Sequence, residues 1–311
     1  MHVILGLSAV GCGSEVIRPR SAVPINGWVA YCAPDSGSSS PMIRKIRLDG
    51  TGARRLSLRG WSCQWDPQGR RLSFADRVGF QFHIFITDSG GSGRIDLGRT
   101  NNTVSSWSLD GRQVLSDGML RDATSGELLG WPPTPPQVFE GDSVYPAYPQ
   151  EFVWDSGHVV VKGFDHHPGG QDSCRLHYDY YISDVHNGAL VERLTKTRYV
   201  DCSDSVLCVS PDGRKILIRC GFASPRITVG VMDVGTQQVI KVTSGRVDPL
   251  AQWGSDNRSI VFMKELDPPQ RVDTYSLFYT SLDSLGRERR ILDGYYVMRG
   301  FDVHLDTEKC K

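Results

Sequence analysis

The sequence predicts an all-β protein, a six-bladed β-propeller with four-stranded antiparallel blades. Three observations carry this prediction: a polar turn followed by alternating apolar residues, a short strand that ends in aspartate, and the lack of any long helical period. The turn and the strand each occur six times, in strict alternation, along the 311-residue chain. Each repeat spans about 42 to 55 residues and holds four short strands, which is the size of one propeller blade.

The first landmark is a hairpin turn, seen most clearly in Val209–Ile218. Proline presets the backbone angle, aspartate bonds back to nearby amides, and Gly or Asn takes the left-handed position that closes the turn. A Trp precedes the turn in most copies, and we expect it to pack between neighbouring sheets. The other copies are Trp65–Phe74, Trp107–Leu115, Trp253–Phe262, a shorter one at Trp154–Val161 and a degenerate one at Pro24–Tyr31.

The second landmark is an apolar strand that ends in aspartate and is followed by a glycine-containing turn and another strand. We expect these aspartates to be turn residues rather than acid–base pairs. They are Asp49, Asp88, Asp122, Asp184, Asp233 and Asp283, and the turn glycines are Gly50, Gly90, Gly126, Gly188, Gly235 and Gly286.

Ring closure requires one strand from the far end of the chain, because the first copy lacks a Trp-bearing strand before its turn. The segment Tyr295–Phe301 follows the sixth unit and has strand character. We predict that it completes the first blade; the alternative is a simple trailing strand.

The turn at Ser210–Gly213, the basic residue after it and the Asp-ended strand resemble the repeat of TolB-like propellers, over residues 24–301. This repeat is specific for the fold and unspecific for function. The resemblance implies interactions in the bacterial envelope and periplasm. No counterpart of TolB's additional N-terminal domain is found here, so a direct role in the Tol system is not expected.

The N-terminal residues indicate export. Residues 1–20 are expected to form a signal-type leader and linker, 21–304 the propeller and 305–311 a tail. An apolar run, Val3–Val10, precedes Gly11 and Cys12, and Ala9–Cys12 resembles the box at which bacterial lipoproteins are lipid-modified. We expect a periplasmic or outer-membrane protein whose only membrane contact is a lipid on Cys12; the alternative is a buried strand or a frayed tail.

The eight cysteines fit an oxidising compartment better than a metal site, because no C-x-x-C pair is present. Cys208 and Cys220 flank a predicted hairpin and are the candidates for a disulfide. The alternative is that both are buried thiols.

Composition excludes few functions. Lys+Arg and Asp+Glu both number 35, so nothing indicates a nucleic-acid partner, and no apolar run reaches the ~18 residues of a membrane span. Serine-hydrolase elbows, phosphate loops and zinc-peptidase helices are absent from the sequence. The weak candidates for a metal site are His166, His167, Asp172 and His177, and a solvated polar loop is the alternative.

A proline- and aromatic-rich insertion, Trp131–Pro149, is either a contact patch or a loop that covers the ring. We expect a monomeric, non-enzymatic scaffold without a cofactor that binds a protein or peptide partner on one face or at the channel mouth. The alternatives are a propeller enzyme, a lyase or hydrolase with its site at the channel, and a carbohydrate-binding module that uses the Trp and Tyr side chains.

Overall fold

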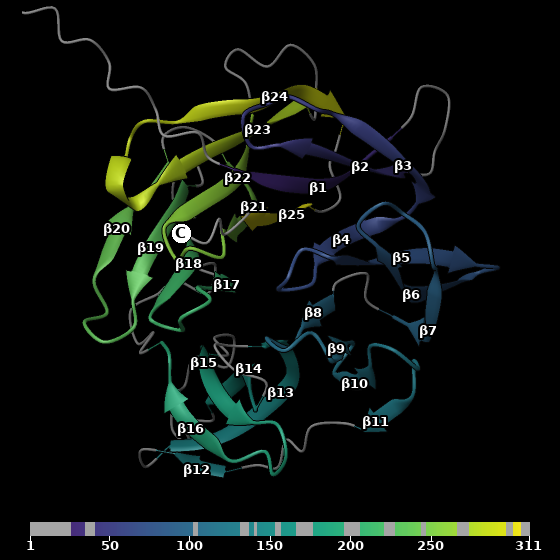
Figure 1. Ribbon diagram of the computed structural model, residues 1–311. Helices are drawn as coiled ribbons and strands as arrows, with labels where there is room; N and C mark the ends of the chain where they lie inside the picture. The colour runs from purple at the N-terminus through teal and green to yellow at the C-terminus, as the bar shows by residue number, and fades with distance from the viewer. Residues whose placement is uncertain are drawn as a thin grey trace, which may run out of the picture.

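The computed structural model describes residues 26–34, 41–101, 105–130, 137–139, 142–152, 157–165, 177–195, 206–220, 228–243, 247–265, 274–296 and 301–305. These residues form six antiparallel sheets arranged radially around a central space (Figure 1). The predicted all-β, six-bladed propeller is therefore confirmed. Within the described ranges, five blades have four strands and one has five.

The strands of each blade lie side by side, in the following order from the channel outwards. Blade 1 consists of β25 (Phe301–Leu305), β1 (Gly27–Pro34), β2 (Pro41–Arg47) and β3 (Arg54–Arg59). Blade 2 consists of β4 (Trp61–Trp65), β5 (Arg71–Val78), β6 (Gln81–Asp88) and β7 (Ile95–Thr100). Blade 3 consists of β8 (Ser105–Trp107), β9 (Gln113–Ser116), β10 (Met119–Asp122) and β11 (Leu128–Gly130).

Blade 4 consists of β13 (Asp142–Phe152), β14 (His158–Asp165), β15 (His177–Asp184) and β16 (Leu190–Arg193), and β12 (Gln137–Phe139) pairs with the first half of β13. Blade 5 consists of β17 (Val206–Val209), β18 (Lys215–Cys220), β19 (Thr228–Asp233) and β20 (Val239–Lys241). Blade 6 consists of β21 (Val247–Trp253), β22 (Ser259–Glu265), β23 (Thr274–Ser281) and β24 (Arg289–Tyr296), with a 3₁₀ turn at Leu282–Ser284.

The hairpin turns have the backbone conformation that the sequence predicts. Gly69, Gly111, Gly213 and Asn257 close the turns after the inner strands with φ between 58° and 71°. Glycine and asparagine tolerate this left-handed region, which is why they occur at this one position of the repeat. In the second landmark, the left-handed residue is Gly91 in blade 2 and Gln237 in blade 5.

Apolar side chains are buried between the blades rather than within one layer. Six core clusters are found among the described residues, one at each junction of adjacent blades. Trp65, Trp107 and Trp253 are 5–7% exposed and each contributes to the junction with the preceding blade. The predicted packing role of these tryptophans is confirmed, since a four-stranded sheet can bury both faces only against neighbours.

Basic side chains also bridge adjacent blades. Arg71, which follows the turn of blade 2, lies 4.8 Å from the ring centre of Trp107 in blade 3. The Nζ atom of Lys45 donates to the carbonyl of Ser89 at 2.5 Å and lies 5.0 Å from the Trp28 ring centre. Burial lowers the pKa of Lys45 from its ordinary value.

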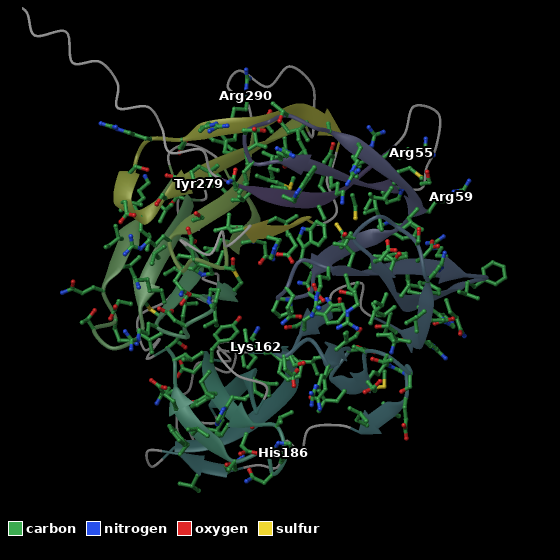
Figure 2. The ribbon with its side chains drawn as sticks, viewed as in Figure 1. Arg55, Arg59, Lys162, His186, Tyr279 and Arg290 are labelled. Atoms are coloured by element: carbon green, nitrogen blue, oxygen red, sulfur yellow. The ribbon has the colours of Figure 1, made fainter. Side chains whose placement is uncertain are left out.

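The outer edge of blade 1 is basic. Arg55 and Arg59 lie on the exposed side of β3, at the rim of the ring (Figure 2). Charged side chains on an edge strand oppose pairing with another chain.

Blade 4 corrects one sequence assignment. The residue that pairs with Val159, as Trp65 pairs with Leu72, is Phe152 and not Trp154. The insertion before it is mostly part of the blade, because Gln137–Phe139 and Asp142–Phe152 are strands. The side-chain amide of Gln137 donates to the Gly188 carbonyl and accepts from the Leu190 N–H, so β12 is held against the outer hairpin of this blade. Trp131–Pro136 and Trp154 lie outside the described residues.

The closing strand also differs from its predicted position. Tyr295 and Tyr296 belong to β24 of blade 6, and only the last residue of the predicted segment, Phe301, begins the closing strand β25. β25 pairs with β1 from Tyr31↔Phe301 to Gly27↔Leu305, so the first blade is completed from the C-terminal side, as predicted. Along the described stretches, no helix is long and apolar enough to cross a bilayer.

Candidate functional site at the channel mouth

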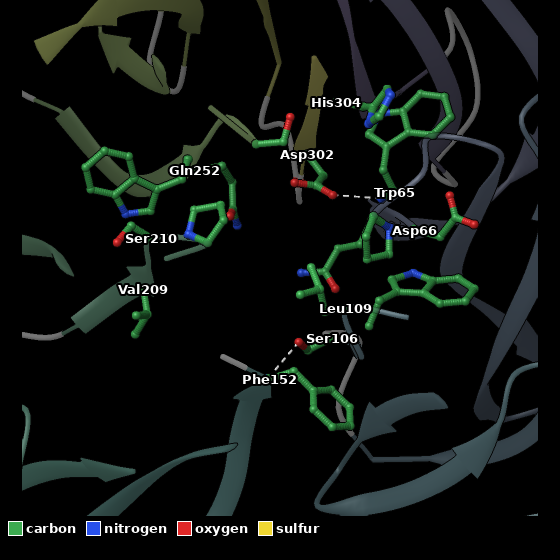
Figure 3. Close-up of a pocket in the computed structure, with 16 residues that line it drawn as sticks. Trp65, Asp66, Ser106, Leu109, Phe152, Val209, Ser210, Gln252, Asp302 and His304 are labelled. Carbon is green, nitrogen blue, oxygen red and sulfur yellow. Dashed lines mark hydrogen bonds between the residues drawn. The ribbon is translucent and has the colours of Figure 1, made fainter. Parts of the chain in front are cut away.

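A cavity of about 240 Å³ opens at the centre of the ring. The innermost strand of every blade contributes to it, so the site exists only when the ring is closed (Figure 3). It is lined by Gln64, Trp65, Asp66, Pro67, Ser106, Trp107, Leu109, Phe152, Val209, Ser210, Pro211, Gln252, Trp253, Ser255, Asp302 and His304.

Buried aromatic side chains form the walls of the cavity. The side chains that solvent can reach are polar, apart from one leucine. Trp65, Trp107, Phe152 and Trp253 are each less than a tenth exposed. Gln64, Gln252, Asp302 and His304 are partly exposed, and Leu109 is 49% exposed. An apolar surface with a few convergent polar groups is typical of a ligand or peptide site.

Asp302 and His304 come from the closing strand and lie against blade 2. Because they are two residues apart on β25, their side chains project from the same side of the strand. The carboxylate of Asp302 accepts a hydrogen bond of 2.7 Å from the Trp65 backbone N–H. The imidazole of His304 lies 6.1 Å from the Trp65 ring, centre to centre.

Two tryptophans at the mouth have unused hydrogen-bond donors. The indole N–H of Trp107 donates to Ser73 Oγ in the preceding blade at 2.9 Å. The register places Ala30 and Leu217, which have no hydroxyl, at the positions equivalent to Ser73 in the blades before Trp65 and Trp253. Accordingly, the Nε1 atoms of Trp65 and Trp253 are buried without a hydrogen-bond partner. A buried donor of this kind costs about 1–3 kcal/mol.

Asp66 is at the mouth but acts in the turn. Its buried carboxylate accepts from the backbone N–H groups of Arg70 and Arg71 at 2.7 and 3.1 Å, and from Arg71 Nε at 3.2 Å. Arg71 also donates to the Gly111 carbonyl in blade 3. The carboxylate therefore orders the turn and one blade junction.

The repeat aspartates are turn residues, as predicted. Asp88, for example, accepts from the N–H groups of Gly90 and Ser92, both at 2.8 Å. These hydrogen bonds favour the carboxylate and lower its pKa, and the same holds for Asp49, Asp122, Asp184 and Asp233. Asp283 differs, since it lies in the 3₁₀ turn and pairs with Arg258 at 3.2 Å.

The structure does not test the predicted metal site. His166, His167 and Asp172 lie outside the described residues, and the side chain of His177 is not described. The buried carboxylate of Asp179, two residues further on, is bound by Arg193 and Thr195. No group of three or more His, Cys, Asp or Glu that could hold a metal is present in the described part of the chain.

The predicted covalent sites also stay predictions. Cys12 and the leader lie outside the described residues. Cys208 is buried, pairs with Leu217 in the strand register and donates to the Ala251 carbonyl at 3.4 Å. Cys220 lies three residues beyond Leu217, opposite Thr228, and its side chain is not described.

Sequence reasoning did not single out Asp302 or His304. Their alternation with Val303 is an ordinary strand pattern, and the signal that would find them is the pairing of residues 301–305 with β1.

Comparison with known proteins identifies the fold. No protein-family model matches the sequence, and no curated protein matches it. Among solved structures, TolB from Acinetobacter baumannii has a TM-score of 0.64 at 17% identity, over 90% of this chain and 67% of that chain. The β-propeller domain of the Trilobed protease from Pyrococcus furiosus gives 0.52 at 17% identity, over 88% and 84%.

An acylaminoacyl peptidase gives a TM-score of 0.53 at 13% identity, over 89% of this chain and 63% of that chain. Likenesses at such identities establish the fold and no activity. The chain is therefore a six-bladed β-propeller with the fold seen in TolB.

Proposed function

We propose that this chain is an exported, non-enzymatic propeller of the bacterial envelope that binds a protein or peptide partner at the channel mouth. Export and a lipid on Cys12 are proposed from the sequence of residues 3–12. The likeness to TolB supports the same compartment.

The observation that carries the proposal is the composition of the mouth. An exposed Leu109, the amides of Gln64 and Gln252, and the charged or polar ends of Asp302 and His304 surround one cavity. A peptide offers both apolar side chains and backbone groups, so it can satisfy this mixture. A carbohydrate would need exposed aromatic faces, whereas the tryptophans at the mouth are 5–7% exposed.

Binding at the mouth can be tested with two matched arginine variants. Leu109 at the mouth and Leu128 on the outer strand of blade 3 are 49% and 48% exposed, so their substitutions perturb folding to a similar extent. The purified wild type, L109R and L128R are each immobilised and exposed to envelope extract, and bound proteins are quantified by mass spectrometry. We expect one or a few proteins to be bound by the wild type and L128R and lost with L109R.

The proposal fails if the wild type retains nothing above empty beads, or if L109R and L128R retain the same proteins. A direct binding measurement with the purified partner then gives the affinity. L109R is expected to weaken this affinity at least tenfold, because binding would bury the charged arginine in an apolar contact that offers no counter-charge.

A further inference from the structure

Cys32 and Cys63 lie together at the junction between blades 1 and 2. Cys32 is on β1 and Cys63 is on the inner strand β4, and the two side chains are 0% and 1% exposed. Both belong to one apolar cluster with Ala30, Ile43 and Phe74. Two strands from different blades therefore direct a cysteine each into the same small volume.

The two thiols are neighbours in this cluster. Burial, followed by the interaction with Cys32, raises the pKa of the Cys63 thiol well above its ordinary value. In the folded, reduced protein the Cys63 thiol is therefore uncharged, and both sulfurs are shielded from solvent.

We propose that Cys32 and Cys63 form a disulfide that joins blade 1 to blade 2. A disulfide joins two sulfurs at ~2.05 Å, so forming the bond requires the two side chains to turn towards each other within their shared cluster. The proposal depends on the proposed export, because thiols stay reduced in the cytosol.

The chemistry requires an oxidant of the disulfide class, R–S–S–R, supplied by a small molecule or by a thiol oxidoreductase. One cysteine thiolate attacks this disulfide, forms a mixed disulfide and releases one R–S⁻. The thiolate of the second cysteine then attacks the cysteine sulfur of the mixed disulfide and releases the second R–S⁻. Overall, two protein thiols lose two protons and two electrons, and the oxidant gains them as two R–SH.

Burial sets the order of events. An oxidant cannot reach sulfurs that are at most 1% exposed, so the bond must form before the two blades finish packing. Once formed, the same burial protects it, and a reductant should cleave it only when the junction opens.

The bond would strengthen the part of the ring that depends on the closing strand. Blade 1 is assembled from both ends of the described chain, since β25 pairs with β1. Cys32 is adjacent to Tyr31, whose partner is Phe301 at the start of β25. A covalent link from β1 to β4 would hold blade 1 in the ring independently of the closing strand.

Peptide mapping of the wild-type chain tests the bond directly. The protein is refolded in a mixture of oxidised and reduced glutathione, alkylated in denaturant without reductant, and digested with trypsin. Cys32 lies in the peptide 21–44 and Cys63 in the peptide 60–70, and each peptide contains one cysteine. We expect these peptides to be joined, with a mass that separates on reduction. The proposal is overturned if both cysteines are alkylated or if either is joined to a different cysteine.

Thermal stability gives a second test. The oxidised protein should have a Tm about 5–10 °C above that of protein reduced in denaturant and refolded with reductant, as expected for a closed loop of about 30 residues. Cys32→Ala should abolish the part of this Tm difference that the bond between Cys32 and Cys63 contributes. Cys208→Ala removes another buried thiol and should preserve it. If Cys32→Ala fails to fold, peptide mapping of the wild type still decides the question, and neither experiment depends on the proposed partner.

Discussion

The carboxylate of Asp302 accepts a hydrogen bond of 2.7 Å from the backbone N–H of Trp65, a residue 237 positions away in the sequence. Asp302 lies on the strand that closes the ring, and Trp65 lies on the inner strand of the next blade. This contact therefore joins the C-terminal side of the chain both to the core and to the mouth of the channel.

Replacing Asp302 with Ala should destabilise the protein by about 1–3 kcal/mol, because the Trp65 N–H would be left without an acceptor in a partly buried site. Asp302→Asn keeps a side-chain oxygen and should cost less. Urea unfolding monitored by tryptophan fluorescence measures both. Equal losses for the two variants would show that the charge, and not the hydrogen bond, is what matters.

The closing strand should be indispensable, whereas the residues after it should not be. A chain that ends at Gly300 loses β25 and uncovers Val29, Ile46 and Leu48 in the junction between blades 6 and 1. We expect its Tm to fall by at least about 10 °C, or the chain not to fold, because an inner strand and its apolar contacts are lost together.

The control is a chain that ends at Leu305, which retains β25 complete. Its Tm should stay within about 2 °C of the full-length value. An equal fall in both chains would contradict the assignment of β25 as the closing element.

Gly69 and Gly79 are a matched pair that separates backbone strain from steric overlap. Both have a left-handed backbone, with φ of 66° and 63°. A Cβ atom at Gly69 would lie 2.2 Å from the His304 ring, whereas one at Gly79 would have no described atom beyond its chain neighbours within 4 Å. Gly79→Ala should cost about 1 kcal/mol from strain, and Gly69→Ala about 3 kcal/mol.

A double-mutant cycle identifies the source of the difference. In a His304→Ala background, the cost of Gly69→Ala should fall towards that of Gly79→Ala, because the overlapping ring has been removed. An unchanged cost would show that His304 does not occupy the position next to the turn.

Acid should destabilise the protein through the turn aspartates. The pKa of Asp122 is lowered in the fold, chiefly by the N–H groups of Ser125 and Thr124. Because the folded pKa lies below the unfolded one, the contribution to stability is complete above the unfolded pKa, near 4, and is lost as the pH falls through the folded pKa.

Asp122→Asn retains an acceptor for the turn but cannot titrate. The free energy of unfolding of this variant should therefore approach that of the wild type as the pH falls from 6 to 3. A difference between the two proteins that does not change over this range would contradict the assignment.

The fold could be read from the sequence because every blade repeats the same local chemistry. Gly69, Gly111, Gly213 and Asn257 occupy the left-handed position that the turn motif requires, and short-range sterics decide this position alone. The buried tryptophans before three of these turns, Trp65, Trp107 and Trp253, were predictable for the same reason, since the repeat places them on the same face of an inner strand.

Only the tertiary structure decided which residues meet across the ring. Phe152 lines the channel because the register of β13 with β14 sets its place, and the motif was too degenerate there to show it. The placement of Asp302 and His304, and the shared cluster of Cys32 and Cys63, arise from strands that are separate in sequence and adjacent in space. A local sequence pattern determines each blade, whereas the pairing of β25 with β1 determines the site. That pairing joins segments about 270 residues apart, and no short-range conformational preference can specify it.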